Sequence, residues 1–264
     1  TKYDNPPFPL PLLKSPSPKA LARSLDASLE RLGVERVDLF QIHYPVPLRR
    51  IDEFADALAS AVRSGKARAV GVSNFNTPLM RAMHAALAQH GVPLASNQVA
   101  FNLLDHSSEI NGVLEACREL CVALIPCVPL AVGILSGRCW SGDAPMSGVQ
   151  QSYLRQGKSD PFHLRAPEIP GQANEGRVKR ALSAPPAMKS LGTLFATMQS
   201  IAETRDKSLV QVALNWLLTA DSLVIPIPGA KNAGQVLENA GALGWRLTPA
   251  ERLSLSQAGA GARC

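Results

Sequence analysis

Polar side chains stand directly after several apolar, strand-like segments of the chain. His43 follows segment 37–42 in the stretch LFQIHYP, and Ser73 and Asn74 follow segment 67–72. A histidine titrates near neutral pH and can move a proton, whereas hydroxyl and amide groups donate and accept hydrogen bonds. A histidine that ends a buried strand is often only a satisfied polar cap. The alternative is a site built from all such strand ends, which also include Gln98, Phe101, Asn102, Pro129–Gly137 and Pro228–Asn232.

The segments around these residues switch between two apolar periodicities, which predicts alternating strands and helices. The predicted strands are Val37–Ile42, Ala67–Val72, Ala95–Phe101, Val122–Val128 and Leu223–Ile227. The predicted helices are Ala20–Leu32, Ile51–Arg63, Leu79–Gln89, Ile110–Cys121, Leu191–Thr204, Leu209–Leu218 and Ala233–Leu243. After the last helix we expect only a basic tail rich in alanine and glycine.

Continuous apolar strands, in place of alternating ones, indicate parallel pairing with both faces of the sheet covered. Strand starts recur every 27 to 30 residues from position 37 to 122, which is the period of a repeated βα unit. An open doubly wound sheet and a closed barrel both fit this order. The G-x-G-x-x-G fingerprint of an open dinucleotide-binding sheet does not follow the first strand. We therefore expect an α/β fold of the (β/α)8 TIM-barrel class.

The composition narrows the classes of partner. The chain has 264 residues, of which 46% are hydrophobic, so a sizeable core can form. The net charge of +6 comes from scattered Lys and Arg without interleaved aromatics, which favours small anionic ligands and no nucleic acid. The five cysteines lack zinc-type pairing, so we expect no metal and a reducing compartment. No apolar run reaches the roughly 18 residues of a membrane span, so no membrane partner is expected.

Residues 138–190 interrupt the alternation of strands and helices. They are rich in glycine and proline and have little periodic apolar pattern. A loop of this length is uncommon in a compact domain unless it is functional or disordered. We expect a long loop insertion after a barrel strand, and the sequence leaves open whether it is a substrate lid or a flexible insertion.

Five stretches stand in a fixed order along the chain: LFQIHYP (39–45), GVSNFN (71–76), SNQVAFN (96–102), PLAVGILSG (129–137) and IPIPGAKNAGQVLEN (225–239). In this order they resemble the aldo-keto reductase family. The family carries at these places its histidine motif, its nicotinamide-amide motif, the following strand, its pyrophosphate loop and its adenosine-phosphate segment. The resemblance covers the chain to about position 250 except for the divergent loop, and it is strongest to plant and algal members of the plastid type.

The resemblance implies hydride transfer between a nicotinamide and a carbonyl, catalysed by Asp, Tyr, Lys and His. Lys2 matches the lysine and His43 the histidine, although a lysine beside a terminus is ordinarily a solvated charge. The family's Asp-x-x-x-x-Tyr stretch is absent, because Tyr3, Tyr44 and Tyr153 all stand outside such a motif. Tyr44 should also point away from His43 if the strand continues. We therefore expect a fragment that lacks the N-terminal quarter of a single barrel domain (1–264) and is inactive alone. It has about six of eight βα units when a strand at Thr1-Lys2 is counted with the five above.

The resemblance also implies an NADP site in three parts. Ser73, Asn74 and Gln98 would hold the nicotinamide carboxamide and Phe101 would stack on its ring, although Ser73 and Asn74 have the alternative of capping a helix. The pyrophosphate loop would use small residues for close backbone approach, and it comprises Pro129, Leu130, Gly133, Leu135 and Ser136. A cation before a helix favours a 2′-phosphate, and the adenosine-phosphate segment comprises Gly229, Lys231, Asn232, Gln235, Glu238 and Asn239. Glu238 has the alternative of a plain surface charge.

Three functions fit these features. The first is an NADP-dependent oxidoreductase acting on an aldehyde or ketone, and the second is a non-catalytic NADP-binding regulatory subunit of the same fold. The third is a different TIM-barrel enzyme that acts on phosphorylated substrates. The carbonyl substrate is not legible, because specificity in this family depends on variable loops such as 138–190. The compartment is expected to be chloroplast or cytoplasm, and the sequence leaves the oligomeric state open.

Overall fold

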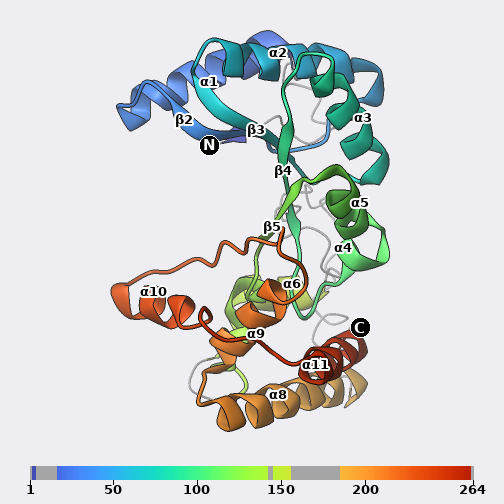
Figure 1. Ribbon diagram of the computed structural model, residues 1–264. Coiled ribbons are helices and arrows are strands. Elements are labelled where there is room, and N and C mark those ends of the chain that lie inside the picture. Colours follow the sequence, from blue (N-terminus) through green and yellow to red (C-terminus); the bar gives the residue numbers. More distant parts are fainter. Residues whose placement is uncertain (1, 4–16, 142–144, 156–184, 263–264) are drawn as a thin grey trace, which may run out of the picture. The chain divides into compact units, whose positions relative to one another are not determined.

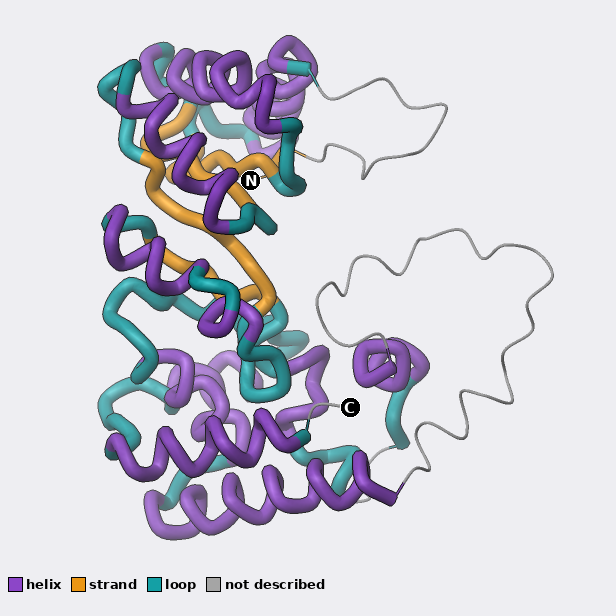
Figure 2. The backbone as a smooth tube through the Cα atoms, turned by 90° about the vertical axis from the view of Figure 1, so that its right-hand side faces the viewer, coloured by secondary structure: helices purple, strands orange, loops and turns teal. Residues whose placement is uncertain are grey.

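The computed structural model describes residues 2–3, 17–141, 145–155 and 185–262. They form two compact units. The first unit comprises Thr1–Val99 and Glu109–Ile125, and the second comprises Ala100–Ser108 and Pro126–Cys264. Strands lie almost wholly in the first unit, whereas the second consists of helices joined by loops (Figure 1, Figure 2). The predicted single barrel domain over 1–264 stays a prediction.

The first unit is built on a five-stranded sheet whose spatial order is the order in the chain. The strands are β1 (Lys2–Tyr3), β2 (Val37–Ile42), β3 (Ala67–Ser73), β4 (Leu94–Ala100) and β5 (Ala123–Cys127). The pairs β1–β2, β2–β3 and β3–β4 are parallel. A doubly wound sheet reverses its order at a switch point, whereas a βα barrel adds each parallel strand beside the last. The observed order is that of the barrel class.

Helices connect the strands of the first unit and dominate the second. Those of the first unit are α1 (Pro18–Leu32), the 3₁₀ turn η1 (Leu48–Arg50), α2 (Ile51–Arg63), α3 (Thr77–Ala88) and α5 (Val113–Leu120). Helix α4 (Ser107–Ile110) lies at the boundary between the units. The second unit contains the 3₁₀ segment η2 (Ala131–Ser136), α6 (Gly148–Arg155), α8 (Pro185–Arg205), α9 (Leu209–Leu218), α10 (Ala233–Ala240) and α11 (Pro249–Gly261). Figure 1 shows α1, α2 and α3 packed along one side of the strands.

Most predicted elements are confirmed, and β2, α2 and α9 begin and end at the predicted residues. The predicted helix Ile110–Cys121 is interrupted, because Gly112 adopts a left-handed conformation (φ 77°) between α4 and α5. Helix α6 and the start of α8 fall within 138–190, so this segment is not wholly a loop. Residues 142–144 and 156–184 of the predicted insertion lie outside the described residues.

The predicted strand Leu223–Ile227 is wrong. Val224 is buried, but Ile225 and Ile227 are 53% and 47% exposed, and no strand forms here. Pro226 and Pro228 explain this, because proline has no N–H to donate to a neighbouring strand. The segment nevertheless lies beside the end of β5, since the Ile227 N–H donates to the Pro126 carbonyl at 3.3 Å.

A helix was missed in the tail rich in alanine and glycine, since residues 249–261 form α11. Thr248 and Glu251 make a reciprocal capping box, and Pro249 occupies the first helical position. Both features favour a helix start and were readable in the sequence as Thr-Pro-Ala-Glu. Alanine has the highest helix propensity of all residues, which offsets the glycines of this segment.

Large apolar side chains fill the interior of each unit. In the first unit, Phe40 and Ile42 of β2 and Phe54 and Leu58 of α2 are fully buried. This is the apolar stripe that the helical periodicity of α2 predicts, because one face of the helix packs on the sheet. In the second unit, the equivalent centre is Trp216 of α9, which is fully buried.

An ion pair ties α8 to α11 in the second unit. The Arg205 guanidinium donates to both carboxylate oxygens of Glu251, at 2.9 and 2.7 Å. The hydrogen bond from Arg205 lowers the pKa of Glu251 to about 2, with a further contribution from the Thr248 backbone N–H. Fork-to-fork geometry of this kind is the stronger class of ion pair.

Glu251→Gln should lower the free energy of unfolding at pH 7 by about 1 kcal/mol, since the partly exposed pair is screened by solvent. The pKa of folded Glu251 lies below its usual value of 4.5. The contribution is therefore complete above pH 4.5 and is lost as the pH falls toward 2. Urea unfolding of residues 1–264 at several pH values should show the variant and the wild type converging in acid. Glu115→Gln, in an exposed pair with Arg118, is the control and should change little at any pH.

Candidate functional site

His43 stands one residue after the end of β2 and is half-buried. Its ring stacks on that of Tyr44, with centroids 4.3 Å apart and planes 19° from parallel. The prediction that Tyr44 points away from His43 is wrong, because strand alternation no longer applies once β2 has ended at Ile42. Lys2 lies opposite Gln41 in the parallel register, one pair before Tyr3 and Ile42. The chain thus positions Lys2 on β1 and His43 directly after the neighbouring strand β2, in one unit.

Ser73, Asn74 and Gln98 come together where β3 and β4 approach their carboxyl ends. The Ser73 hydroxyl and the Asn74 N–H both donate to the Gln98 carbonyl oxygen, at 2.7 and 2.9 Å. The Asn74 side-chain amide donates to the His43 carbonyl at 3.0 Å, which links this group to the end of β2. Asn74 has a left-handed backbone (φ 62°), which asparagine tolerates better than most residues. The alternative that Ser73 and Asn74 cap α3 is not supported, since Asn76 fills that position.

The carboxamide of Gln98 is available to a ligand. Gln98 is 7% exposed, and its side chain makes no hydrogen bond to any residue in the part of the chain that the structure describes. A buried or nearly buried amide normally has partners. An uncommitted amide beside Ser73 is therefore a candidate binding group.

Two further residues position this group and were missed by sequence reasoning. Asn97 is fully buried, and its side chain donates to the Phe75 carbonyl and accepts from the Phe75 N–H. This fixes the turn directly after Asn74. Gly71 lets β3 and β4 approach, because an added Cβ would lie 2.9 Å from the Ser96 carbonyl oxygen. An asparagine in a buried strand is unusual, and that was the signal available in the sequence.

Phe101 opens the second unit and lies in its core. It is fully buried and packs on Trp216 with ring centroids 5.2 Å apart. This packing explains the residue as a core aromatic. It lends no support to the stacking role, which stays a prediction.

The predicted pyrophosphate loop (129–137) and Val128 directly before it, together the 128–137 loop, have a strained backbone. Val128, Ala131 and Val132 have positive φ values of 55°, 49° and 51°, and Gly133 and Gly137 follow with 89° and 77°. A β-branched residue in this region is a genuine outlier, and such strain gathers at functional sites. The conformation of the loop therefore costs free energy, which contacts with the surrounding structure must offset.

Side chains of this loop anchor it to the unit. Pro129 and Leu135 are buried, and Leu130 packs against Val210, Leu214 and Ala242. The Ser136 hydroxyl donates to the Gly133 carbonyl at 2.7 Å. Apolar contacts thus anchor the loop to the rest of the unit. The candidate contacts with a ligand are the polar groups of the loop.

The segment 229–232 is folded back onto α10. Asn232 caps the helix by accepting from the Gln235 N–H, and the Gln235 side chain accepts from the Lys231 N–H at 2.7 Å. Asn239 donates to the Gly229 carbonyl at 3.4 Å. Lys231 itself is exposed. Gln235 and Asn239 therefore position the segment that carries Lys231, and their predicted contact with adenosine stays a prediction.

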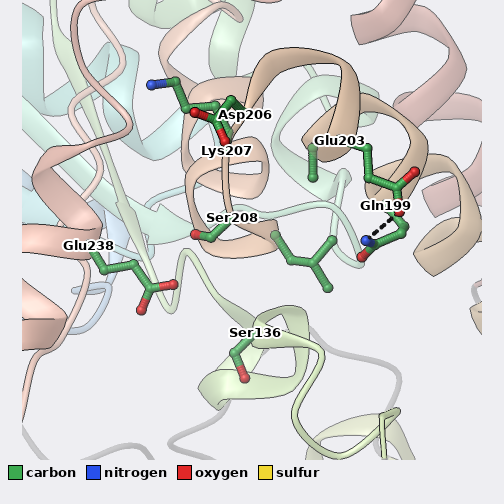
Figure 3. Close-up of a pocket in the computed structure, with 9 residues that line it drawn as sticks. Ser136, Gln199, Glu203, Asp206, Lys207, Ser208 and Glu238 are labelled. Atoms are coloured by element: carbon green, nitrogen blue, oxygen red, sulfur yellow. Dashed lines mark hydrogen bonds between the residues drawn. The ribbon is translucent and has the colours of Figure 1, made fainter.

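A pocket of about 450 Å³ lies in the second unit. Figure 3 shows Glu238 of α10, Ser136 of η2 and Ser208 at the start of α9 around it. Its other lining residues are Gln199, Ala202, Glu203, Asp206, Lys207 and Leu209. Two predicted cofactor residues from separate segments, Ser136 and Glu238, thus share one pocket. The contact of Glu238 with adenosine stays a prediction, beside the alternative of a plain surface charge.

Two other kinds of site are not seen. No three or more His, Cys, Asp or Glu residues of the described ranges gather so that they could hold a metal ion. None of the helices in the described part of the chain is long and apolar enough to cross a membrane.

The comparison with known protein families decides the classification. The model of the aldo/keto reductase family matches residues 10–258. The chain belongs to the aldo/keto reductase family. The resemblance found in the five sequence motifs is thereby confirmed.

Individual relatives agree with this family. A chloroplastic pyridoxal reductase of Arabidopsis thaliana is 33% identical over 236 residues, covering 88% of this chain and 55% of the relative. An aldo-keto reductase of Schizosaccharomyces pombe designated for NADP(+) is 29% identical and covers 88% of this chain and 60% of that protein. This aldo/keto reductase chain thus spans little more than half the length of these relatives.

A solved structure confirms the fold class. A glycerol dehydrogenase of Gluconobacter oxydans superimposes with a TM-score of 0.70 at 26% identity, over 93% of this chain and 65% of that one. The predicted (β/α)8 barrel class is therefore correct for this aldo/keto reductase. Its sequential parallel strands are those expected of such a barrel.

The left-handed backbone of Asn74 generates a prediction for paired variants. Asn74→Gly loses the hydrogen bond to the His43 carbonyl but keeps the backbone conformation, so it should cost about 1 kcal/mol of unfolding free energy. Asn74→Ala loses the same bond and places at positive φ a residue that tolerates this conformation less well than asparagine or glycine, so it should cost about 2 kcal/mol. Chemical denaturation measures both. Equal losses in the two variants would contradict the strained geometry.

Proposed function

We propose that this chain contributes to an NADP-dependent oxidoreductase that transfers a hydride between NADPH and an aldehyde or ketone. The observation that carries the proposal is the uncommitted Gln98 carboxamide beside Ser73 at the ends of β3 and β4. An amide and a hydroxyl in this arrangement suit a carboxamide, which offers both donors and an acceptor. Family membership adds that nicotinamide chemistry is the common activity of such chains.

Residues of the second unit, considered by themselves, suit the phosphate and adenosine groups of NADP. Lys231 is exposed just before α10, where its charge and the helix N-terminus favour a phosphate. The pocket offers Glu238 and Ser136, which can accept from or donate to ribose hydroxyls and the adenine amine. Glu203 and Asp206 also line it, so a phosphate is better placed at Lys231 than inside the pocket. Bound NADPH would supply the hydride.

His43 and Lys2 are the chain's own candidates for the carbonyl end. His43 would orient or polarise the carbonyl oxygen, and Lys2 would favour the ionised form of a tyrosine acid. The sequence contains no Asp-x-x-x-x-Tyr stretch to supply that tyrosine. Tyr44, which stacks on His43, does not stand in such a motif. Carbonyl reduction is therefore proposed for the whole protein and not for residues 1–264 alone.

One relative supports an aldehyde as the substrate and the chloroplast, beside the cytoplasm, as a candidate compartment. The Arabidopsis relative is a chloroplastic reductase of pyridoxal, which is an aldehyde. A regulatory NADP-binding subunit is the second candidate, because the described site offers cofactor contacts while the acid motif is absent from this sequence. Turnover of aldehydes by the whole protein would favour the enzyme, and cofactor binding without turnover would favour the regulatory subunit.

Lys231→Ala should weaken NADPH binding to residues 1–264 by about tenfold or more, because one charge-assisted contact to the 2′-phosphate is lost. Binding of NADH, which has no 2′-phosphate, should be unchanged. Quenching of NADPH and NADH fluorescence measures both affinities. Lys66→Ala removes the same charge from an exposed pair with Asp26 and serves as the control. Equal losses for the two cofactors would refute the role of Lys231.

Residues 1–264 should bind NADPH without oxidising it in the presence of small aldehydes. The reason is that a lysine and a histidine are present but the motif that carries the acid is not. The measurement is NADPH absorbance over time with a short-chain aldehyde and with pyridoxal, at enzyme and cofactor concentrations that saturate binding. Aldehyde-dependent loss of NADPH would show that another group of this chain serves as the acid.

A further inference from the structure

The strained loop 128–137 needs partners that hold its backbone. Two of its left-handed residues, Val128 and Val132, are β-branched, and each prefers a different conformation in isolation. Such conformations persist only where neighbouring groups fix them. The carbonyl groups of these same two valines accept hydrogen bonds from side chains outside the loop.

The Val128 carbonyl is held by Asn102. The side-chain amide of Asn102 donates to the Val128 oxygen at 3.0 Å and to the Tyr153 hydroxyl at 2.8 Å. Its carbonyl accepts from the Leu104 N–H at 2.9 Å, so the orientation of the amide is fixed. Asn102 is fully buried and Tyr153 is 4% exposed. Burial raises the pKa of the Tyr153 phenol, with a smaller opposing effect of Asn102, so the hydroxyl stays neutral.

The Val132 carbonyl is held by Gln150. The Gln150 amide donates to the Val132 oxygen at 3.3 Å, and its own carbonyl accepts from the Ser147 N–H at 2.9 Å. Gln150 and Tyr153 are three residues apart on α6, so they share one face of that helix. This face therefore reaches both strained valines, one directly and the other through Asn102.

We infer that Gln150 and Tyr153 are positioning residues, through which α6 holds the 128–137 loop in the conformation that receives the pyrophosphate of NADP(H). The inference rests on the proposed function. It gives α6, which lies within the predicted 138–190 insertion, a role in cofactor affinity that neither a lid nor a flexible insertion would have. The role assigned to the two side chains is to hold the carbonyl groups of Val132, directly by Gln150, and of Val128, by Tyr153 through Asn102.

The test uses residues 1–264 and two nearly isosteric variants. Tyr153→Phe removes only the hydroxyl, and Gln150→Glu keeps the acceptor for Ser147 but replaces the donor to Val132. The probes are NADPH, followed by its fluorescence, and 2′-AMP, followed by calorimetry, since 2′-AMP has the adenosine and 2′-phosphate but no pyrophosphate. Val149→Ala, at a 52% exposed position of the same helix, is the matched control.

Each variant should weaken NADPH binding by roughly three- to tenfold, the equivalent of one lost hydrogen bond, and leave 2′-AMP binding and the control unchanged. Thermal unfolding checks that the variants are folded. If Tyr153→Phe unfolds, the more exposed Gln150→Glu still decides the question. Unchanged NADPH affinity in a folded variant, or equal loss of both ligands, would overturn the inference. A wild type that binds neither ligand would instead refute the proposed function.

Discussion

The backbone carbonyl oxygen of Gln98 fixes the arrangement of the strand ends in the first unit. It accepts from the Ser73 hydroxyl and from the Asn74 N–H, so β3 and β4 are locked together at their carboxyl ends. The Asn74 side-chain amide then donates to the carbonyl of His43, directly after the neighbouring strand β2. Parallel strands leave their last polar groups unpaired at one edge, and here side chains satisfy them. Because those bonds use backbone carbonyls, the amide of Gln98 itself is left for another partner.

In the second unit, the candidate ligand surface is formed by a loop with a strained backbone. Three non-glycine residues of the 128–137 loop are left-handed, and the cost is offset by buried Pro129 and Leu135 and by two side-chain amides. The two units thus differ in how they shape a ligand surface. One relies on strand register and the other on contacts from residues distant in sequence.

This difference explains which features could be predicted from the sequence. Register and strand ends follow from local apolar patterns, so β2 and α2 were predicted to the residue, and the strand-end residues were identified from their positions. Secondary structure was predicted wrongly where two local signals compete. Apolar residues and a proline do so in segment 223–227, as do alanines and glycines in α11. Contacts such as Asn102 with Tyr153 join residues 51 positions apart, and no local pattern encodes them.

The helix that follows Lys231 has a further consequence. No residue of α10 is buried, and Val236 and Leu237 are 55% and 74% exposed. The contacts of Asn232, Gln235 and Asn239 stay within residues 229–240, so the helix is attached to α9 by the hydrogen bond from the Gln211 amide to the Glu238 carbonyl, at 3.2 Å, and not by apolar burial. Segments of this kind open locally at small free-energy cost. Amide hydrogens of α10 will therefore exchange with solvent sooner than those of α9, and any ligand that bridges Lys231 to this helix will slow that exchange.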